Sequence, residues 1–434
     1  MYTRNPSNLF YILILLSCLL IRPCIAIAGD WPQWRGVDRN GKSDETGLLS
    51  SWPDAGPRLL WKASGAGTGY SSLAVSAGRV FTMGKHGDDE FVLAFSVEDG
   101  KLLWRLRSGG AFHDGRGSGP RATPTVHGDK VYAVGPKGDL TCATISGEIV
   151  WQVNILQRFV GGYKKSHGIC ESVLIEGNKV ICSPGGEDHC VVALDRFTGS
   201  TIWTSKGLSD STSYASAVAM TVGGVRQIVH FVGASAAGIR ADDGLLMWQN
   251  TSSVNTNGNH AATPVVRDNH VFVTSGYGAG CALVELSSEG GRTNAKEVYF
   301  NKVMKNHHGG VVLVDGYIYG YSNKMVCMDF LTGERKWRVD GPGKCSLIYA
   351  DGHLYCLSQD GVMALVEANP DSYVERGRFI FRTFDHFKIG GFDEEDEKPT
   401  WARPVIANGK LLLRDQDNLY CYDIKDSAGK TSRR

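Results

Sequence analysis

The side chains best suited to chemistry in this sequence recur at comparable positions, each a few residues before a short apolar segment. They carry imidazole, guanidinium and phenol groups and belong to Tyr70, Arg121, His167, Tyr214, His260, His307, His308 and Arg403. Arginine forks and titratable histidines suit an anionic ligand or a carboxylate-bearing peptide, and three histidines suit a transition metal. A third interpretation is that these groups only line a water-filled channel. No carboxylate suited to general acid–base catalysis accompanies them, so we expect no catalytic residue.

A repeat of glycine and tryptophan sets the positions of these side chains. The two residues lie four apart in Gly100/Trp104, Gly147/Trp151, Gly199/Trp203, Gly244/Trp248 and Gly333/Trp337, and Trp61 precedes them. The tryptophans recur about every 45 residues, with one interval about twice as long, which is typical of a solenoid or a propeller. The 54 glycines suit many short strands joined by tight turns, because glycine adopts positive φ freely.

Each repeat reads as four short strands. Residues 123–126, 130–134, 140–145 and 149–153 alternate in hydrophobicity and are separated by turns at Gly128, Gly138 and Gly147, which predicts an antiparallel propeller blade. First strands of eight such units begin near Leu73, Ala122, Ser172, Ser216, Thr263, Val311, Ser346 and Arg403. We therefore predict an all-β, eight-bladed propeller over residues 57–425, with residues 29–56 as an N-terminal arm packed against it.

The two ends of the repeat region complement one another. The last unit has three predicted strands, at 404–406, 410–414 and 419–424, and the strand 59–62 has no strands before it. Pairing them closes the ring and leaves no open sheet edge. The outermost strands carry Trp61, Trp104, Trp151, Trp203, Trp248 and Trp337, which we expect to pack on the next blade and to hydrogen-bond a turn carbonyl, not to stack on a ligand.

The repeat resembles the pyrroloquinoline-quinone-type propeller repeat, whose blades end in A-x-D-x-x-T-G-x-x-x-W. The pattern is met from Ala193 to Trp203 and again from Met328 to Trp337. Residues Asp30 to Gly36 resemble the start of a group of secreted bacterial proteins, common in planctomycetes, that are similar to the outer-membrane assembly factor BamB. This resemblance implies the fold more strongly than any function, since one fold hosts many functions.

Quinoprotein alcohol dehydrogenases share the resemblance and imply an alternative. They oxidise alcohols, polyvinyl alcohol or sugars, are longer than this chain, and carry a disulfide between adjacent cysteines against the quinone. They also hold Ca²⁺ through several oxygen ligands. This sequence has no Cys-Cys pair and no identifiable set of axial carboxylates. We therefore expect no cofactor, and in particular no pyrroloquinoline quinone with Ca²⁺.

The N-terminus is typical of an export signal. Arg4 precedes the apolar stretch Leu9 to Ile21, which is short for a membrane span, and Ala26-Ile27-Ala28 is a cleavage site. We predict a signal peptide over residues 1–28, and a periplasmic or secreted chain with no transmembrane segment after cleavage. Lipidation at Cys18 and an uncleaved anchor are the alternatives.

Nine cysteines remain after residue 28, most of them within apolar strand patterns, which indicates small buried side chains. Cys182 and Cys190 flank a predicted hairpin turn, and a bridge between them is an open alternative. The acidic run Asp393 to Glu397 interrupts the repeat and reads as a solvated loop, with a cation site or a partner site as alternatives. Residues 426–434 read as a polar tail.

The overall charge excludes some classes of partner. A formal net charge of +1 over 434 residues gives no general attraction to nucleic acid. We expect a monomeric, non-catalytic binding or scaffold module of the cell envelope, whose partner is another envelope protein or a polymer. A quinone-dependent dehydrogenase and a metal-binding propeller, with its ligands unknown, are the alternatives.

Overall fold

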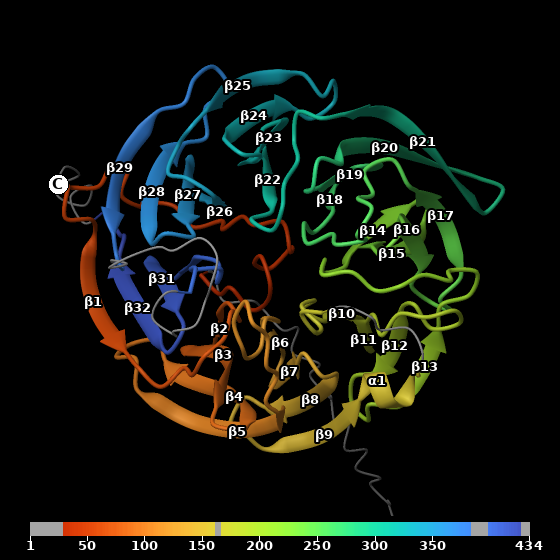
Figure 1. Cartoon of the computed structure of the whole chain (residues 1–434), viewed down its shortest axis with the longest axis horizontal. Coiled ribbons are helices and arrows are strands. Elements are labelled where there is room, and N and C mark those ends of the chain that lie inside the picture. Colours follow the sequence, from red (N-terminus) through yellow and green to blue (C-terminus); the bar gives the residue numbers. More distant parts are fainter. Residues whose placement is uncertain (1–28, 161–165, 383–397, 427–434) are drawn as a thin grey trace, which may run out of the picture.

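The computed structural model describes residues 29–160, 166–382 and 398–426. The predicted signal peptide, the acidic run at 393–397 and most of the polar tail lie outside the described residues. Eight four-stranded antiparallel sheets stand around a central axis (Figure 1), as the sequence predicts. The part of the chain that is described contains one short helix, α1 (Ile155–Arg158).

In blades 1 to 7 the strands follow chain order from the axis outward, so that the fourth strand is outermost. Blade 1 comprises β2 (Ala74–Ser76), β3 (Arg79–His86), β4 (Asp89–Ser96) and β5 (Leu102–Gly110). Blade 2 comprises β6 (Thr125–His127), β7 (Lys130–Val134), β8 (Asp139–Thr144) and β9 (Ile149–Asn154). Blade 3 comprises β10 (Leu174–Glu176), β11 (Lys179–Cys182), β12 (Val192–Asp195) and β13 (Thr201–Thr204). Blade 4 comprises β14 (Val218–Val222), β15 (Val225–Phe231), β16 (Ala236–Arg240) and β17 (Leu246–Asn250).

The later blades continue this order. Blade 5 comprises β18 (Val265–Arg267), β19 (His270–Ser275), β20 (Gly280–Glu289) and β21 (Arg292–Asn301). Blade 6 comprises β22 (Val311–Val314), β23 (Tyr317–Tyr321), β24 (Met325–Asp329) and β25 (Arg335–Val339). Blade 7 comprises β26 (Cys345–Ala350), β27 (His353–Ser358), β28 (Val362–Glu367) and β29 (Glu375–Ile380).

Blade 8 closes the ring. Its three inner strands are β30 (Val405–Ala407), β31 (Lys410–Asp415) and β32 (Asn418–Asp423), and its outer strand is β1 (Arg58–Ala63), which pairs antiparallel with β32. The predicted pairing of the two chain ends is confirmed. It leaves blade 8 with the same four-stranded sheet as the other blades, so that no blade lacks its outer strand.

The repeated glycine and tryptophan meet across blades and not within one blade. A Cβ added to Gly147 would lie 2.8 Å from the indole of Trp104 in the preceding blade, and Gly100, Gly199 and Gly244 relate to Trp61, Trp151 and Trp203 in the same way. Each of these glycines also has positive φ. In blades 1 to 3, the glycine therefore packs under the tryptophan of the preceding blade. The tryptophan four residues later covers the glycine of the following blade.

Five of the six indole N–H groups donate to a main-chain carbonyl in the turn of the next blade, at distances of 2.9–3.2 Å. Trp248 is the exception and donates to Gln227 Oε1 in its own blade. In blade 5 the third and fourth strands, β20 and β21, are ten residues long each and form an extended hairpin. In that blade Tyr299 takes the place of tryptophan and donates to Phe330 O.

All nine cysteines after residue 28 are free thiols, and eight of them are buried. The bridge left open between Cys182 and Cys190 is therefore not formed. None of the described helices is long and apolar enough to cross a bilayer.

Candidate functional site

The N-terminal arm crosses the axis of the ring and contacts the inner ends of most blades. Trp31 exchanges main-chain hydrogen bonds with Val75 in blade 1, and Pro32 O accepts from Val126 N in blade 2. Arg39 donates to Ser172 O and Val173 O in blade 3. Figure 1 shows this red and orange segment running into the centre of the ring. The arm thus forms the floor of a funnel that is walled by the blades.

Three further contacts fix the part of the arm at the axis. Trp34 Nε1 donates to Thr263 Oγ1 at the entry of blade 5. Arg35 Nη2 donates to Val311 O in blade 6 and to Asn40 O within the arm. Arg35 and Arg39 both adopt positive φ, which is uncommon for side chains of this size and shows a backbone shaped to its position.

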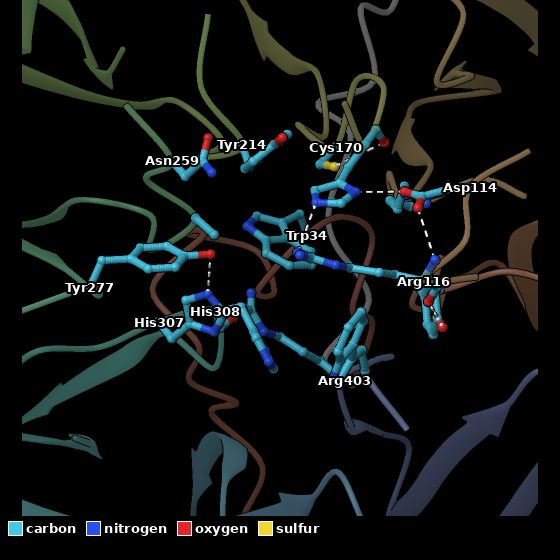
Figure 2. Close-up of a pocket in the computed structure, with 15 residues that line it drawn as sticks. Trp34, Asp114, Arg116, Cys170, Tyr214, Asn259, Tyr277, His307, His308 and Arg403 are labelled. Atoms are coloured by element: carbon cyan, nitrogen blue, oxygen red, sulfur yellow. Dashed lines mark hydrogen bonds and ion pairs between the residues drawn. The ribbon is translucent and has the colours of Figure 1, made fainter. Parts of the chain in front are cut away.

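A cavity of about 180 Å³ lies in the funnel (Figure 2). Its lining includes seven of the eight residues that the sequence singles out: Tyr70, Arg121, His167, Tyr214, His307, His308 and Arg403. Each lies a few residues before the first strand of a blade, so the shared mouth follows from their comparable positions in the repeat. The remaining lining residues are Trp34, Asp114, Arg116, Cys170, Asn259, Ala261, Tyr277 and Trp401.

His260 does not line the cavity, although its neighbours Asn259 and Ala261 do. Its imidazole is fully buried and stacks on Phe231 with ring centroids 4.0 Å apart. Its ring nitrogens contact Ser275 Oγ and Gly233 O at 2.9 and 3.1 Å. The apolar ring of Phe231 and these polar partners hold the side chain between blades, so its role is in packing.

Aromatic rings form one continuous wall of the cavity. Tyr70 contacts Trp401, Trp401 contacts His308, His308 contacts His307, and His307 contacts Tyr277, with ring centroids 4.8–5.2 Å apart. Tyr277 also bonds its hydroxyl to His307 Nε2 at 2.9 Å and adopts positive φ between two glycines. Such a wall presents ring faces and edges to any planar or apolar part of a ligand.

Asp114 is the carboxylate of the described lining, and it is already engaged. It accepts from Arg121 Nη2 at 2.8 Å, contacts His167 Nδ1 at 2.5 Å and accepts from Arg116 N. Burial opposes ionisation of this carboxyl, but the hydrogen bonds from Arg116 N–H and His167 and the charge of Arg121 outweigh it, so its pKa is lowered. Asp114 is therefore charged at neutral pH and holds Arg121 and His167 in place.

The two adjacent histidines behave differently from the arginines. Burial, with the charges of Lys344 and Arg116, lowers the pKa of His307 to about 4, and burial, with the charge of Lys344, lowers the pKa of His308 well below its usual value. Both rings are therefore neutral at pH 7. Arg403 extends along the floor with its guanidinium 4.0 Å from the ring centroid of Trp34, and it donates to His308 O.

Cys170 contributes a thiol to the lining of this cavity. Burial raises its pKa to about 12, against a smaller opposing effect of Arg121. The thiol is thus protonated at neutral pH, which makes it a poor nucleophile. Among the residues described, no group of three or more histidine, cysteine, aspartate or glutamate side chains is placed to hold a metal ion.

The lining residues that the sequence left unnoticed come from the arm and from loops. Trp34 belongs to the segment Asp30 to Gly36, and Asp114 and Arg116 to the glycine-rich loop before β6. The position of Lys344 in the repeat could have identified it from the sequence. Lys344 immediately precedes β26, as the other site residues precede their strands, and it lines a neighbouring cavity of about 350 Å³ that shares Tyr277 and His307 with the funnel.

Comparisons with known proteins agree with this architecture. The family model described as outer membrane protein assembly factor BamB matches residues 42–162 and 88–339. The outer membrane protein assembly factor BamB of Kangiella koreensis is 25% identical over 227 residues, which are 48% of this chain and 49% of that protein. The chain thus spans about half the length of this curated relative.

Two solved structures show the same fold at low sequence identity. The structure of BamB from Moraxella catarrhalis has a TM-score of 0.58 at 14% identity, and the match covers 85% of this chain and 100% of the BamB chain. Quinohemoprotein alcohol dehydrogenase from Comamonas testosteroni has a TM-score of 0.61 at 13% identity, and the match covers 92% of this chain and 81% of the dehydrogenase chain. Because the family model matches well over half of its residues, this chain belongs to the family of the outer membrane protein assembly factor BamB.

Proposed function

We propose that this chain is a non-catalytic binding propeller of the bacterial cell envelope, whose funnel holds a carboxylate-bearing segment of another envelope protein. The convergence of Arg116, Arg121 and Arg403 on one aromatic-walled cavity carries the proposal. Asp114 offsets only part of this charge, through Arg121 and His167. The cavity therefore retains positive charge for a ligand, and arginine is well suited to carboxylates.

The neighbouring cavity extends the cationic surface. Lys305 and Lys344 line it, and it adjoins the funnel at Tyr277 and His307. Burial lowers the pKa of Lys344, which shows an ammonium group partly withdrawn from water, and Asp360 opposes this shift. An extended segment with more than one acidic group would reach both cavities. This supports an acidic polypeptide over a single small metabolite.

The described residues do not fit a quinone held by Ca²⁺. A calcium ion needs several oxygen ligands, whereas the described lining offers the engaged carboxylate of Asp114 and the amide of Asn259. The single thiol of Cys170 offers no disulfide between adjacent cysteines. We therefore propose that the chain acts without this cofactor. Export, with cleavage after Ala28, is part of the same proposal, and the intact mass of the exported chain distinguishes it from a diacylglyceryl adduct at Cys18.

The proposal is tested with an acidic peptide that has a free C-terminal carboxylate and with its amidated, glutamine-substituted counterpart. Calorimetry and the fluorescence change of the tryptophans report binding. We expect the acidic peptide to bind, the neutral peptide to bind at least about tenfold more weakly, and added salt to weaken binding, because charge-assisted hydrogen bonds contribute about 1.5–3 kcal/mol each. Polygalacturonate serves as the anionic polymer probe.

Matched variants locate the site. Arg116→Gln removes a funnel guanidinium and should weaken the acidic peptide about tenfold. Arg107→Gln, on the outer strand β5 where Arg107 pairs with Asp89, should leave the affinity unchanged. Equal binding of both peptides, equal effects of both variants, or binding of polygalacturonate alone would overturn the proposed ligand. Dye reduction with alcohols after addition of pyrroloquinoline quinone and Ca²⁺, lost in Arg121→Gln, would favour the dehydrogenase alternative.

A further inference from the structure

A further cavity, smaller and more enclosed than the funnel cavity, lies between the arm and the first strands of the blades. It leaves about 10 Å³ for the centre of a water-sized particle, which is room for one small occupant. Its lining includes Trp31, Trp34, Arg35, Thr123 and Arg403. Arg35 and Arg403 are 3% and 5% exposed, so both guanidinium groups have left bulk water.

Three hydrogen-bonding atoms of this lining have no partner among the described residues. They are Arg35 Nη1, Arg403 Nη1 and Thr123 Oγ1, and each is buried. The other terminal nitrogens of the two arginines are used: Arg35 Nη2 donates to Asn40 O and Val311 O, and Arg403 Nη2 donates to His308 O. The unpartnered atoms are two N–H donors and a hydroxyl that is also able to donate. Buried donors of this kind are normally satisfied.

The two guanidinium groups also lie close to one another. A Cβ built on Gly310 would stand 2.6 Å from Arg35 Nη1 and 3.5 Å from Arg403 Nη2. Burial lowers the pKa of Arg35 to about 10, and burial together with the charge of Arg35 lowers the pKa of Arg403 well below its usual value. Arg39 differs, because the carboxylate of Glu171 opposes the effect of its burial. Two like charges out of water are costly unless a counter-ion is present.

We propose that a small inorganic anion, chloride under physiological conditions, occupies this cavity and bridges Arg35 and Arg403. An anion needs only donors, which these three atoms supply, whereas a water molecule would also need acceptors for its own hydrogens. The size of the cavity favours a monatomic anion over sulfate or phosphate. Because Arg35 belongs to the arm and Arg403 to the last blade, the anion would fasten the arm to the closed ring. Arg403 also lines the funnel, whereas Arg35 and Thr123 do not, so the anion site rests on two residues that the proposed funnel ligand does not use.

Bromide replaces chloride and is visible by anomalous scattering. Crystals of the exported chain soaked in sodium bromide should show an anomalous peak between Arg35, Thr123 and Arg403. In solution, thermal and urea unfolding are compared in sodium chloride, sodium bromide and sodium gluconate at equal ionic strength. Above the dissociation constant, a tenfold increase in chloride or bromide should lower the unfolding equilibrium constant about tenfold. Gluconate, too large for the cavity, should have no such effect.

Variants separate this site from general salt effects. Thr123→Val and Arg403→Met should each reduce the difference between bromide and gluconate. Thr125→Val is the matched control, because Thr125 Oγ1 donates to Val173 O and does not line the cavity; it should lose stability and keep the halide effect. If Arg403→Met fails to fold, Thr123→Val and the anomalous map still decide. Electron density at this site without an anomalous signal would indicate a water molecule and would overturn the proposal. A halide effect on stability that is unchanged in Thr123→Val and Arg403→Met would overturn it as well.

Discussion

At the scale of single residues, burial more than residue type decides which groups of the funnel carry charge. His307 and His308 are neutral at pH 7 because burial lowers their pKa values, and Cys170 is neutral because burial raises its pKa. Asp114 stays charged because three donors surround it. The positive charge available to a ligand at neutral pH therefore comes from arginines, which stay protonated over the whole physiological range.

Glu90, behind the funnel wall, provides a test of this effect of burial on stability. The carboxyl is 2% exposed and accepts from Phe112 N at 3.1 Å. Burial raises its pKa from 4.5 to about 7, against that hydrogen bond and the charge of Arg121. The folded chain thus binds this proton more tightly than the unfolded chain. The unfolding free energy should fall as pH rises from about 4.5 to about 7, by on the order of 3 kcal/mol from this group.

Glu90→Gln should remove this part of the pH dependence, because glutamine keeps an acceptor for Phe112 N and carries no charge. Urea unfolding at closely spaced pH values measures it. Glu98→Gln, at an exposed position in the turn after β4, is the control and should leave the slope unchanged. A Glu90→Gln profile that parallels the parent between pH 4.5 and 7 would contradict the raised pKa.

At the scale of elements, the contact between a tryptophan and the glycine of the next blade joins neighbouring sheets. Trp104 on β5 covers Gly147 in the turn before β9 and donates to Ile145 O in the same turn. The glycine is required twice, because φ is +96° and because a Cβ would collide with the indole. Where Tyr299 replaces tryptophan, a Cβ on Gly333 would likewise lie 2.9 Å from its ring.

We predict that Gly147→Ala is more destabilising than Gly128→Ala. Gly128 has a similar positive φ of +62°, but a Cβ there would meet nothing within 4 Å. Both substitutions strain the backbone, by about 1 kcal/mol. Only Gly147→Ala also overpacks the blade interface, which costs about 1–3 kcal/mol more. Equal midpoints of chemical unfolding for the two variants would show that the Trp104 indole shifts to accommodate the added methyl group without loss of stability.

At the scale of the whole molecule, closure of the ring rests on Arg414 as well as on the pairing of β1 with β32. Its buried guanidinium, on β31 of blade 8, donates to Met83 O on β3 of blade 1 and to Gly67 O and Ser71 O in the segment that leads into that blade. It also donates to Thr82 Oγ1 at 2.6 Å. One side chain thus satisfies main-chain carbonyls of the first blade, and of the segment leading into it, from within the last blade.

We predict that Arg414→Met destabilises the fold by about 3 kcal/mol or more, because it leaves several buried carbonyls without donors. Arg58→Met is the matched control: Arg58 pairs with Asp423 across the same closing blade, but its side chain is 72% exposed. Its loss should cost less than about 1 kcal/mol. The midpoint and cooperativity of denaturant unfolding measure both. Similar costs for the two variants would show that Arg414 contributes no more to closure than a surface ion pair.

Most of the fold could be predicted because its signals are local. Alternating strands, turn glycines and the interval of about 45 residues each depend on a few neighbours in sequence. The strand expected at 130–134 coincides with β7 (Lys130–Val134), and the strand expected at 59–62 lies within β1. The missing strand of the last unit and the unpaired strand near Trp61 were sufficient to predict the closure of the ring.

The sequence by itself also determined which repeat position faces the funnel, since equivalent residues of a symmetric ring meet at one mouth. Only the tertiary structure decided which side chains reach it. His260 occupies the right position, but its ring packs on Phe231, and a buried stacking partner is not visible in a local pattern. Trp34 and Asp114 reach the cavity from an arm and a loop whose places depend on contacts with distant blades. The charges were decided there too, because burial and neighbouring groups set each pKa.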